Sequence, residues 1–76
     1  MATTKSFSGK RLRELRERAG VSRMALAYAC SRTEQSVYIW ERGRSRPEPD
    51  LLDPIASMLG VERDDLFEEQ AERANA

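Results

Sequence analysis

The stretch Ser22-Arg-Met-Ala-Leu-Ala-Tyr-Ala-Cys-Ser-Arg-Thr-Glu-Gln-Ser-Val-Tyr-Ile-Trp-Glu-Arg-Gly43 decides the fold of this 76-residue chain. It predicts two short helices joined by a tight turn. Ser22 and Thr33 are good N-caps, because their hydroxyl groups can accept a hydrogen bond from an unpaired amide of the first helical turn. The predicted helices therefore cover residues 23–30 and about 34–42, and the glycine that closes the stretch ends the second helix.

Four apolar residues allow these two helices to cross. Ala27 is small enough for the helix backbones to approach, and Leu26 anchors the first helix in the core. Val37 and Trp40 lie one turn apart on the inner face of the second helix. The turn needs a left-handed residue, which is usually glycine, and here we expect Ser31 to adopt this conformation at a cost of roughly 1 kcal/mol. The pattern predicts a helix-turn-helix, which can place its second helix in the major groove of DNA.

Three further helices are expected around this motif. A first helix covers residues 7–19, because apolar residues recur along one face and a glycine follows. A fourth begins between residues 50 and 54, with Asp53 as its cap and Pro54 in the first helical position, and a fifth covers roughly residues 62–69. Outside the motif, the residues expected on inner faces are Leu12, Leu15, Ala19, Leu51, Leu52, Ile55, Ala56, Met58, Leu59, Val61, Leu66 and Phe67.

Length and composition limit the class of protein. We expect one domain over residues 7–69, a flexible arm over residues 1–6 and an acidic, alanine-rich tail over residues 70–76. No apolar stretch approaches the ~20 residues that span a bilayer, and the N-terminus lacks the apolar centre of a signal peptide. With one cysteine and no histidine, we expect no catalytic residues, no metal and no cofactor. A cytoplasmic, nucleoid-associated protein is the expectation.

The charges are divided between the two halves of the chain, although the net charge is zero. Residues 1–46 carry eleven Lys and Arg against four Glu, a balance of +7. Residues 47–76 carry two Arg against nine Asp and Glu, a balance of −7. This asymmetry indicates one face for a polyanion and one turned away from it. The alternative is that helical surfaces are simply charged, but the basic half is also the half that holds the helix-turn-helix.

Several short motifs, taken in order and at their spacings, resemble a known family. They are Leu12-Arg-Glu-Leu-Arg-Glu-Arg-Ala-Gly-Val-Ser22, Leu26-Ala27, Thr33-Glu-Gln-Ser-Val37, Trp40-Glu-Arg-Gly43, Leu51-Leu52 with Ile55-Ala56, and Leu59-Gly60-Val61. Over residues 9–67 the chain resembles the phage repressor and Cro-like helix-turn-helix family, also called the xenobiotic-response-element type. The resemblance implies an all-α, compact five-helix, lambda-repressor-like DNA-binding domain with the helix-turn-helix at helices 2 and 3.

The exposed face of the second motif helix is the expected base-reading surface. Gln35 is the strongest candidate, because a glutamine amide can bond adenine N6 and N7 together. Glu34 can accept a hydrogen bond from a cytosine amino group, and Ile39 can contact a thymine methyl group. The alternative for each residue is an ordinary solvated helix face. The predicted base contacts are Glu34, Gln35, Ser36, Tyr38 and Ile39.

Basic residues around this helix are expected to contact phosphates. The resemblance implies that Arg23 binds a phosphate from the first position of its helix, where the family usually has glutamine. It also implies that Glu41 pairs with Arg16 and orients it, and that Arg42 contacts the DNA backbone. Such contacts supply salt-dependent affinity but no sequence information. The predicted phosphate contacts are Arg16, Arg23, Arg32, Thr33, Arg42, Arg44 and Arg46.

The sequence therefore predicts a sequence-specific regulator of transcription that binds double-stranded DNA with a recognition helix over residues 33–42. We expect a homodimer on a pseudo-palindromic operator. The candidate dimer contacts are Val61, Leu66 and Phe67, together with the tail after Glu68. The alternative is a protein-interaction module, antitoxin-like or a bridging factor, whose acidic C-terminal half binds a basic partner protein. Cys30 is expected to be a small buried residue and not a redox sensor.

Overall fold

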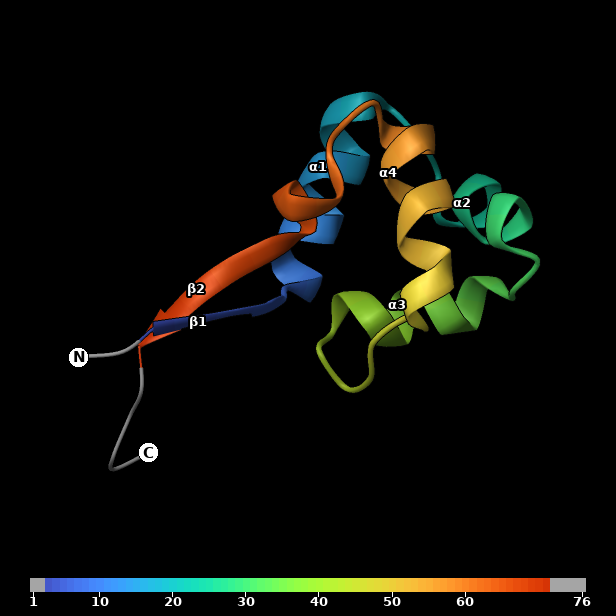
Figure 1. The fold of residues 1–76 in the computed structure, drawn as a ribbon. Helices are drawn as coiled ribbons and strands as arrows, with labels where there is room; N and C mark the ends of the chain where they lie inside the picture. Colours follow the sequence, from blue (N-terminus) through green and yellow to red (C-terminus); the bar gives the residue numbers. More distant parts are fainter. Residues whose placement is uncertain (1–2, 72–76) are drawn as a thin grey trace.

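The structure is a computed structural model and describes residues 3–71. In this part of the chain, four α-helices form a body from which a two-stranded sheet projects (Figure 1). The elements are β1 (Thr3–Phe7), α1 (Gly9–Ala19), α2 (Arg23–Cys30), α3 (Glu34–Glu41), the 3-10 turn η1 (Pro49–Leu51), α4 (Leu52–Leu59), the 3-10 turn η2 (Arg63–Leu66) and β2 (Phe67–Ala71).

Caps supplied by the sequence set where three helices begin. Ser22 and Thr33 each accept, through the hydroxyl group, a hydrogen bond from the amide three residues later, as expected. Ser8 caps α1 in the same way, so this helix begins at Gly9, two residues later than predicted. The turn between α2 and α3 has Ser31 at a φ of 57°, which confirms the predicted left-handed residue.

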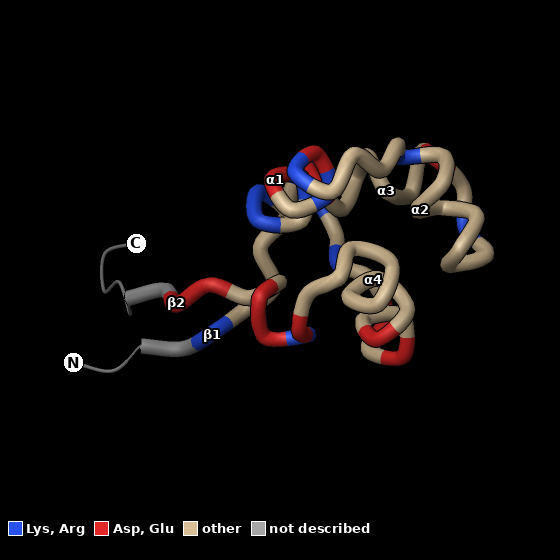
Figure 2. Tube along the Cα trace, turned by 90° about the horizontal axis from the view of Figure 1, so that it is seen from above, with Lys and Arg blue, Asp and Glu red and all other residues tan. Residues whose placement is uncertain are grey.

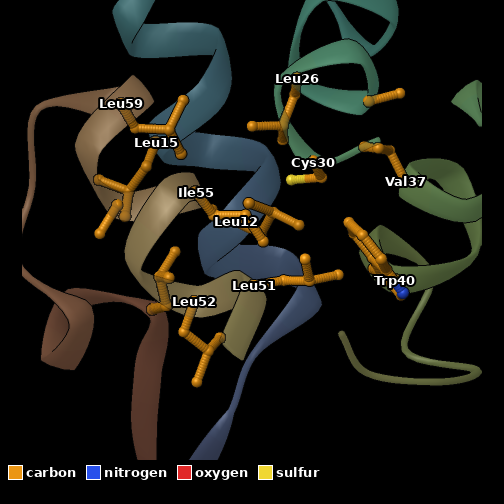
Figure 3. Close-up of a cluster of buried hydrophobic side chains, with 13 residues drawn as sticks. Leu12, Leu15, Leu26, Cys30, Val37, Trp40, Leu51, Leu52, Ile55 and Leu59 are labelled. Atoms are coloured by element: carbon orange, nitrogen blue, oxygen red, sulfur yellow. The ribbon is translucent and has the colours of Figure 1, made fainter. Parts of the chain in front are cut away.

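One hydrophobic core joins the four helices (Figure 3). Leu12, Leu26, Val37 and Ile55, one from each helix, are fully buried, and Figure 3 shows their neighbours pointing toward the same centre. Ala27 and Cys30 are buried as expected. Two residues expected on inner faces, Ala19 and Met58, are exposed. Ala19 is the last residue of α1, and Met58 lines a shallow apolar hollow on the surface with Met24 and Tyr28 of α2.

The start of α4 differs from the prediction. Pro49 opens η1, and η1 continues directly into α4 at Leu52. The amide of Leu52 already donates to the carbonyl of Pro49, so the chain is helical before it reaches Asp53. Asp53 is therefore not a cap, and Pro54 is the third residue of the helix instead of the first.

The two-stranded sheet replaces two expected features. β1 and β2 pair antiparallel, with Phe7 opposite Phe67 and Lys5 opposite Glu69. The expected flexible arm over residues 1–6 is wrong for residues 3–6, which belong to a strand. The expected fifth helix over residues 62–69 is wrong as well, because the helical turn η2 ends at Leu66. The predicted tail lies outside the described residues from residue 72 onward.

Pairing between distant segments explains this difference. The ring of Phe67 meets that of Phe7 edge to face, with centroids 6.3 Å apart, in an arrangement that aromatic pairs prefer. Ser8 donates through its backbone N–H to the carbonyl of Leu66 over 2.9 Å. These partners are about sixty positions apart, so a periodicity within residues 62–69 cannot reveal them. Of the five helices expected, the first four are present in the described residues, and a strand pair takes the place of the fifth.

Candidate nucleic-acid interface

The outward face of α3 is built by the way that α2 and α3 cross. Of the eight residues of α3, Val37 and Trp40 are buried, and they pack on the core beside Ala27. The other residues of α3 therefore lie toward solvent or at the edge of the core. Of the five predicted base contacts, Glu34, Gln35 and Tyr38 are exposed, and Ser36 and Ile39 are half-buried.

Two shallow hollows bring predicted base and phosphate contacts together on this face. Arg23, Glu34, Gln35 and Tyr38 line the first hollow. The second shares Gln35 and Tyr38 and adds three more residues of the site. The structure thus places candidates from α2, α3 and the following loop side by side. The additional residues of the second hollow are Ile39, Arg42 and Arg44.

Ser36 and Thr33 are partly engaged within the protein. The Oγ1 of Thr33 accepts a hydrogen bond from the amide of Ser36, and the two hydroxyl oxygens lie 3.1 Å apart. Both side chains therefore serve the cap of α3. Any contact of theirs with DNA has to use the hydrogen-bonding capacity that the cap leaves free.

Glu41 connects three elements of the site. Its carboxylate accepts two hydrogen bonds from Arg16 and a third, over 3.1 Å, from Nε of Arg23. The predicted Arg16–Glu41 pair is confirmed, and its side chains are 9% and 3% exposed. The hydrogen bond to Glu41 raises the pKa of Arg16 more than burial lowers it, so the guanidinium is firmly charged. Sequence reasoning missed that Arg23 shares the same carboxylate.

The two arginines of this cluster differ in what they can offer to a ligand. Arg16 donates its remaining terminal nitrogen to the carbonyl of Val21 over 2.9 Å, so all of its nitrogens are engaged within the protein. Arg23 uses only Nε toward Glu41, and its side chain is 32% exposed. The geometry therefore leaves Arg23, more than Arg16, open to a phosphate.

Arg42, Arg44 and Arg46 form a basic edge beside α3. All three are exposed, and no carboxylate of the described residues lies within 4.0 Å of their side chains. Arg32 differs, because it pairs with Glu48 over 3.4 Å. Since the pair is exposed, it contributes at most about 1 kcal/mol and can open to another anion.

Acidic residues gather away from this edge. Figure 2 shows Lys and Arg positions together with Glu positions around α1, whereas the charged positions on β2 and α4 are acidic. A hollow between α4 and η2 has four carboxylates and Arg63 among its lining residues. The carboxylates are Asp53, Glu62, Asp64 and Asp65. The acidic residues of the C-terminal half thus gather on α4, η2 and β2, whereas α1 carries charges of both signs.

The residues proposed from the sequence for a dimer contact are used in the core. Leu66 is fully buried, and Val61 and Phe67 are half-buried against the same core. Leu66 therefore has no surface to offer a second copy. Within residues 3–71, no three His, Cys, Asp or Glu side chains are grouped so that they could hold a metal ion. None of the helices in that range has the length and apolar character needed to cross a membrane.

Comparisons with known proteins identify the class. The sequence model of the helix-turn-helix domain family matches residues 9–70, which is most of the chain. This chain belongs to the helix-turn-helix family, in agreement with its predicted resemblance to the phage repressor and Cro-like type. The class that this match supports for the chain is a DNA-binding regulator of transcription.

Two solved structures resemble this one closely. The restriction-modification controller protein C.AhdI from Aeromonas hydrophila is 34% identical, with a TM-score of 0.70 over 78% of this chain and 89% of that chain. The P22 c2 repressor, solved in complex with a synthetic operator, is 23% identical, with a TM-score of 0.72 over 80% of this chain and 92% of that chain. The second likeness shows the fold alone. No curated protein sequence matches this chain.

Proposed function

We propose that this protein is a sequence-specific transcriptional regulator that inserts α3 into the major groove of duplex DNA. The observation that carries the proposal is the outward face of α3, where exposed polar side chains lie beside Arg42 and Arg44, which have no carboxylate partner among the described residues. Such a face suits DNA, because arginines meet the phosphates while polar side chains reach base edges.

The contacts divide by chemistry. Gln35 and Glu34, in the first turn of α3, read base edges, and Ile39, which lines the second hollow, meets a thymine methyl group. Ser36 completes this set. Arg42 and Arg44 hold the backbone on one side of α3. The other proposed phosphate contacts are Arg23, Arg32, Thr33 and Arg46. Arg16 is not among them, because its three nitrogens are engaged by Glu41 and Val21.

A twofold dimer is part of the proposal. Regulators of this architecture read pseudo-palindromic sites with half-sites about one helical turn apart. One of the two similar structures is named a repressor in complex with its operator and the other a controller protein, and these names support the role of a regulator. Such a regulator would act on chromosomal DNA inside the cell.

The decisive experiment selects bound sites from a random pool of duplex DNA. We expect an enriched site with twofold symmetry and an affinity that falls steeply with salt, because each neutralised phosphate releases counterions. Arg44→Ala should reduce the slope of log affinity against log salt by about 1. Arg63→Ala is the matched control, since it removes an equal charge from the acidic side, where Arg63 faces Asp53. Equal slopes for both variants would contradict the proposed interface.

A protein-interaction module is the second candidate function. The hollow lined by acidic side chains between α4 and η2 favours it, because a basic partner would find complementary charge there. A stoichiometric complex with a protein, formed without any binding of duplex DNA, would favour this function over the first. The variant Asp64→Lys should then weaken the complex and leave the α3 face untouched.

A further inference from the structure

The ring of Tyr38 lies beneath two guanidinium groups. The Cζ atom of Arg23 is 5.3 Å from the ring centroid, and the Cζ atom of Arg42 is 5.7 Å from it. A guanidinium within ~6 Å of an aromatic centroid is attracted by the negative face of the ring. The two arginines come from different places, the start of α2 and the end of α3. Tyr38 is therefore a contact that joins the two helices of the motif at the surface.

The two arginines need this contact to different degrees. Arg23 is also held by the carboxylate of Glu41, so one of its orientations is already favoured. The side chain of Arg42 has no hydrogen bond or ion pair with any other described residue. Among the described residues, the ring of Tyr38 is thus the contact that restricts the side chain of Arg42. All three side chains are accessible from solvent, because Tyr38 is 41% exposed, Arg42 is exposed and the side chain of Arg23 is 32% exposed.

An arginine side chain that is restricted before it binds DNA binds with higher affinity. A free arginine side chain loses rotamer freedom when it docks on a phosphate, and this loss opposes binding. An arginine that already rests on a ring loses less of this freedom. A pair of arginines on one ring is also held at a set separation, which matches two phosphates only in particular positions of the helix in the groove.

We propose that Tyr38 is a positioning residue, which holds Arg23 and Arg42 in place for two phosphates. This inference rests on the proposed function. It gives Tyr38 a role in backbone contact in place of the base contact expected from the sequence. The role predicts that loss of the ring affects specific and non-specific DNA alike, because phosphates are present in every sequence.

The first test measures DNA binding by Tyr38→Leu. We expect affinity to fall by about 3- to 10-fold for specific and random duplexes alike, with the selected site sequence unchanged. Tyr38→Phe keeps the ring and should recover most of the loss. Tyr28→Leu is the matched control, because Tyr28 is 87% exposed on α2 and lies in the apolar hollow beside Met58. In the Arg42→Ala background, the effect of Tyr38→Leu should shrink.

Three results would overturn this role. They are a changed preference at one base pair with random-DNA affinity intact, a loss for Tyr38→Phe equal to that for Tyr38→Leu, and additive effects of Tyr38→Leu and Arg42→Ala. The first would make Tyr38 a base-reading residue. The second would assign the effect to its hydroxyl group, and the third would show that the ring and Arg42 act independently.

A second test needs no DNA. An aromatic ring shifts the NMR resonances of protons that lie over its face, so the Nε–H signals of Arg23 and Arg42 should move in Tyr38→Leu and stay in place in Tyr28→Leu. Unmoved signals would overturn the positioning role alone. Moved signals, with no DNA binding by the wild-type protein, would overturn the proposed function and with it the role of this contact.

Discussion

Gly9 lies against the backbone carbonyl of Trp40, where the first turn of α1 meets the last turn of α3. A Cβ atom at Gly9 would collide with the carbonyl oxygen of Trp40 and would lie 2.8 Å from that of Glu41. The missing side chain therefore lets the N-terminal end of α1 approach the C-terminal end of α3. The approach is electrostatically favourable, because the positive end of one helix dipole faces the negative end of another.

Gly9→Ala should destabilise the protein by about 1–3 kcal/mol, because the added methyl group overpacks this contact. The sign of the change in stability is informative, because the same substitution within an ordinary helix stabilises the protein by up to about 1 kcal/mol. Urea unfolding of the variant measures it. Lys10→Ala, at the exposed neighbouring position, should change stability by less than about 0.5 kcal/mol. A Gly9→Ala variant as stable as the wild type would refute the close approach.

Glu41→Gln should cost about 3 kcal/mol, because it leaves the buried guanidinium of Arg16 without its compensating charge. Glutamine keeps the shape of the side chain, so the charge is the main thing removed. Glu17→Gln is the control, since Glu17 pairs with exposed Arg13, and such a pair contributes less than about 1 kcal/mol. Thermal unfolding of both variants at low salt should rank them in this order, and equal losses would speak against a buried cluster.

Ser8→Ala should destabilise the protein more than Ser22→Ala, by about 2 against about 1 kcal/mol. Both serines cap a helix, but Ser8 also donates its hydroxyl to Glu68 over 3.0 Å and is buried, whereas Ser22 is exposed. Chemical denaturation of the two variants provides the comparison. In a Glu68→Gln background, the extra loss of stability caused by Ser8→Ala should become smaller. An unchanged loss would show that the hydrogen bond between Ser8 and Glu68 does not contribute to stability.

The stability of the protein should fall at alkaline pH because of Cys30. Burial raises the pKa of this thiol above its ordinary value, and the nearby charge of Arg32 offsets this in part. A raised pKa in the folded state means that the stabilising contribution is complete below the ordinary pKa, about 8.5, and is lost as pH rises toward the folded value.

Urea midpoints at several pH values test this prediction. Between the two pKa values, the wild type should lose up to about 1.4 kcal/mol per pH unit more than Cys30→Ala. The slopes are compared instead of the absolute stabilities, because alanine also leaves a small cavity. Parallel curves for the two proteins would show that the thiol is not desolvated by folding.

Gln35→Ala and Arg42→Ala should affect DNA binding in different ways. The first should weaken the selected site by roughly 1–3 kcal/mol and leave random DNA nearly unaffected, because a base contact is lost. The second should weaken every duplex and reduce the salt slope by about 1, because a phosphate contact is lost. Titrations on both kinds of DNA at three salt concentrations measure this. Indistinguishable variants would mean that base and backbone contacts are not divided in this way.

The sequence predicted the helix-turn-helix itself in detail. The caps Ser22 and Thr33, the left-handed Ser31 and the buried pair Val37 and Trp40 all lie where the pattern placed them. Each of these features depends on residues within about one helical turn. The Arg16–Glu41 pair spans 25 positions, and it was predicted through the resemblance to a family and not through local rules.

The segments at the two ends were mispredicted for the same physical reason. Residues 62–69 have two apolar residues near their end, which fits a short helix as well as a strand. The choice depends on β1, which offers its backbone and Phe7 to the other segment. Pairing of this kind is set by the partner and not by the local sequence. The sequence of one segment alone therefore could not predict the strand pair.

By itself, the sequence determined the helices of the motif, their caps, their apolar faces and the division of charge between the halves, because these follow from neighbouring residues and composition. The tertiary structure alone decided that Arg16 is enclosed while Arg42 rests on Tyr38, that Gly9 must have no side chain, and that the ends of the described chain meet as strands. Those outcomes depend on contacts between residues that are distant in the sequence and that packing brings together. Such contacts produce no periodic pattern in the sequence.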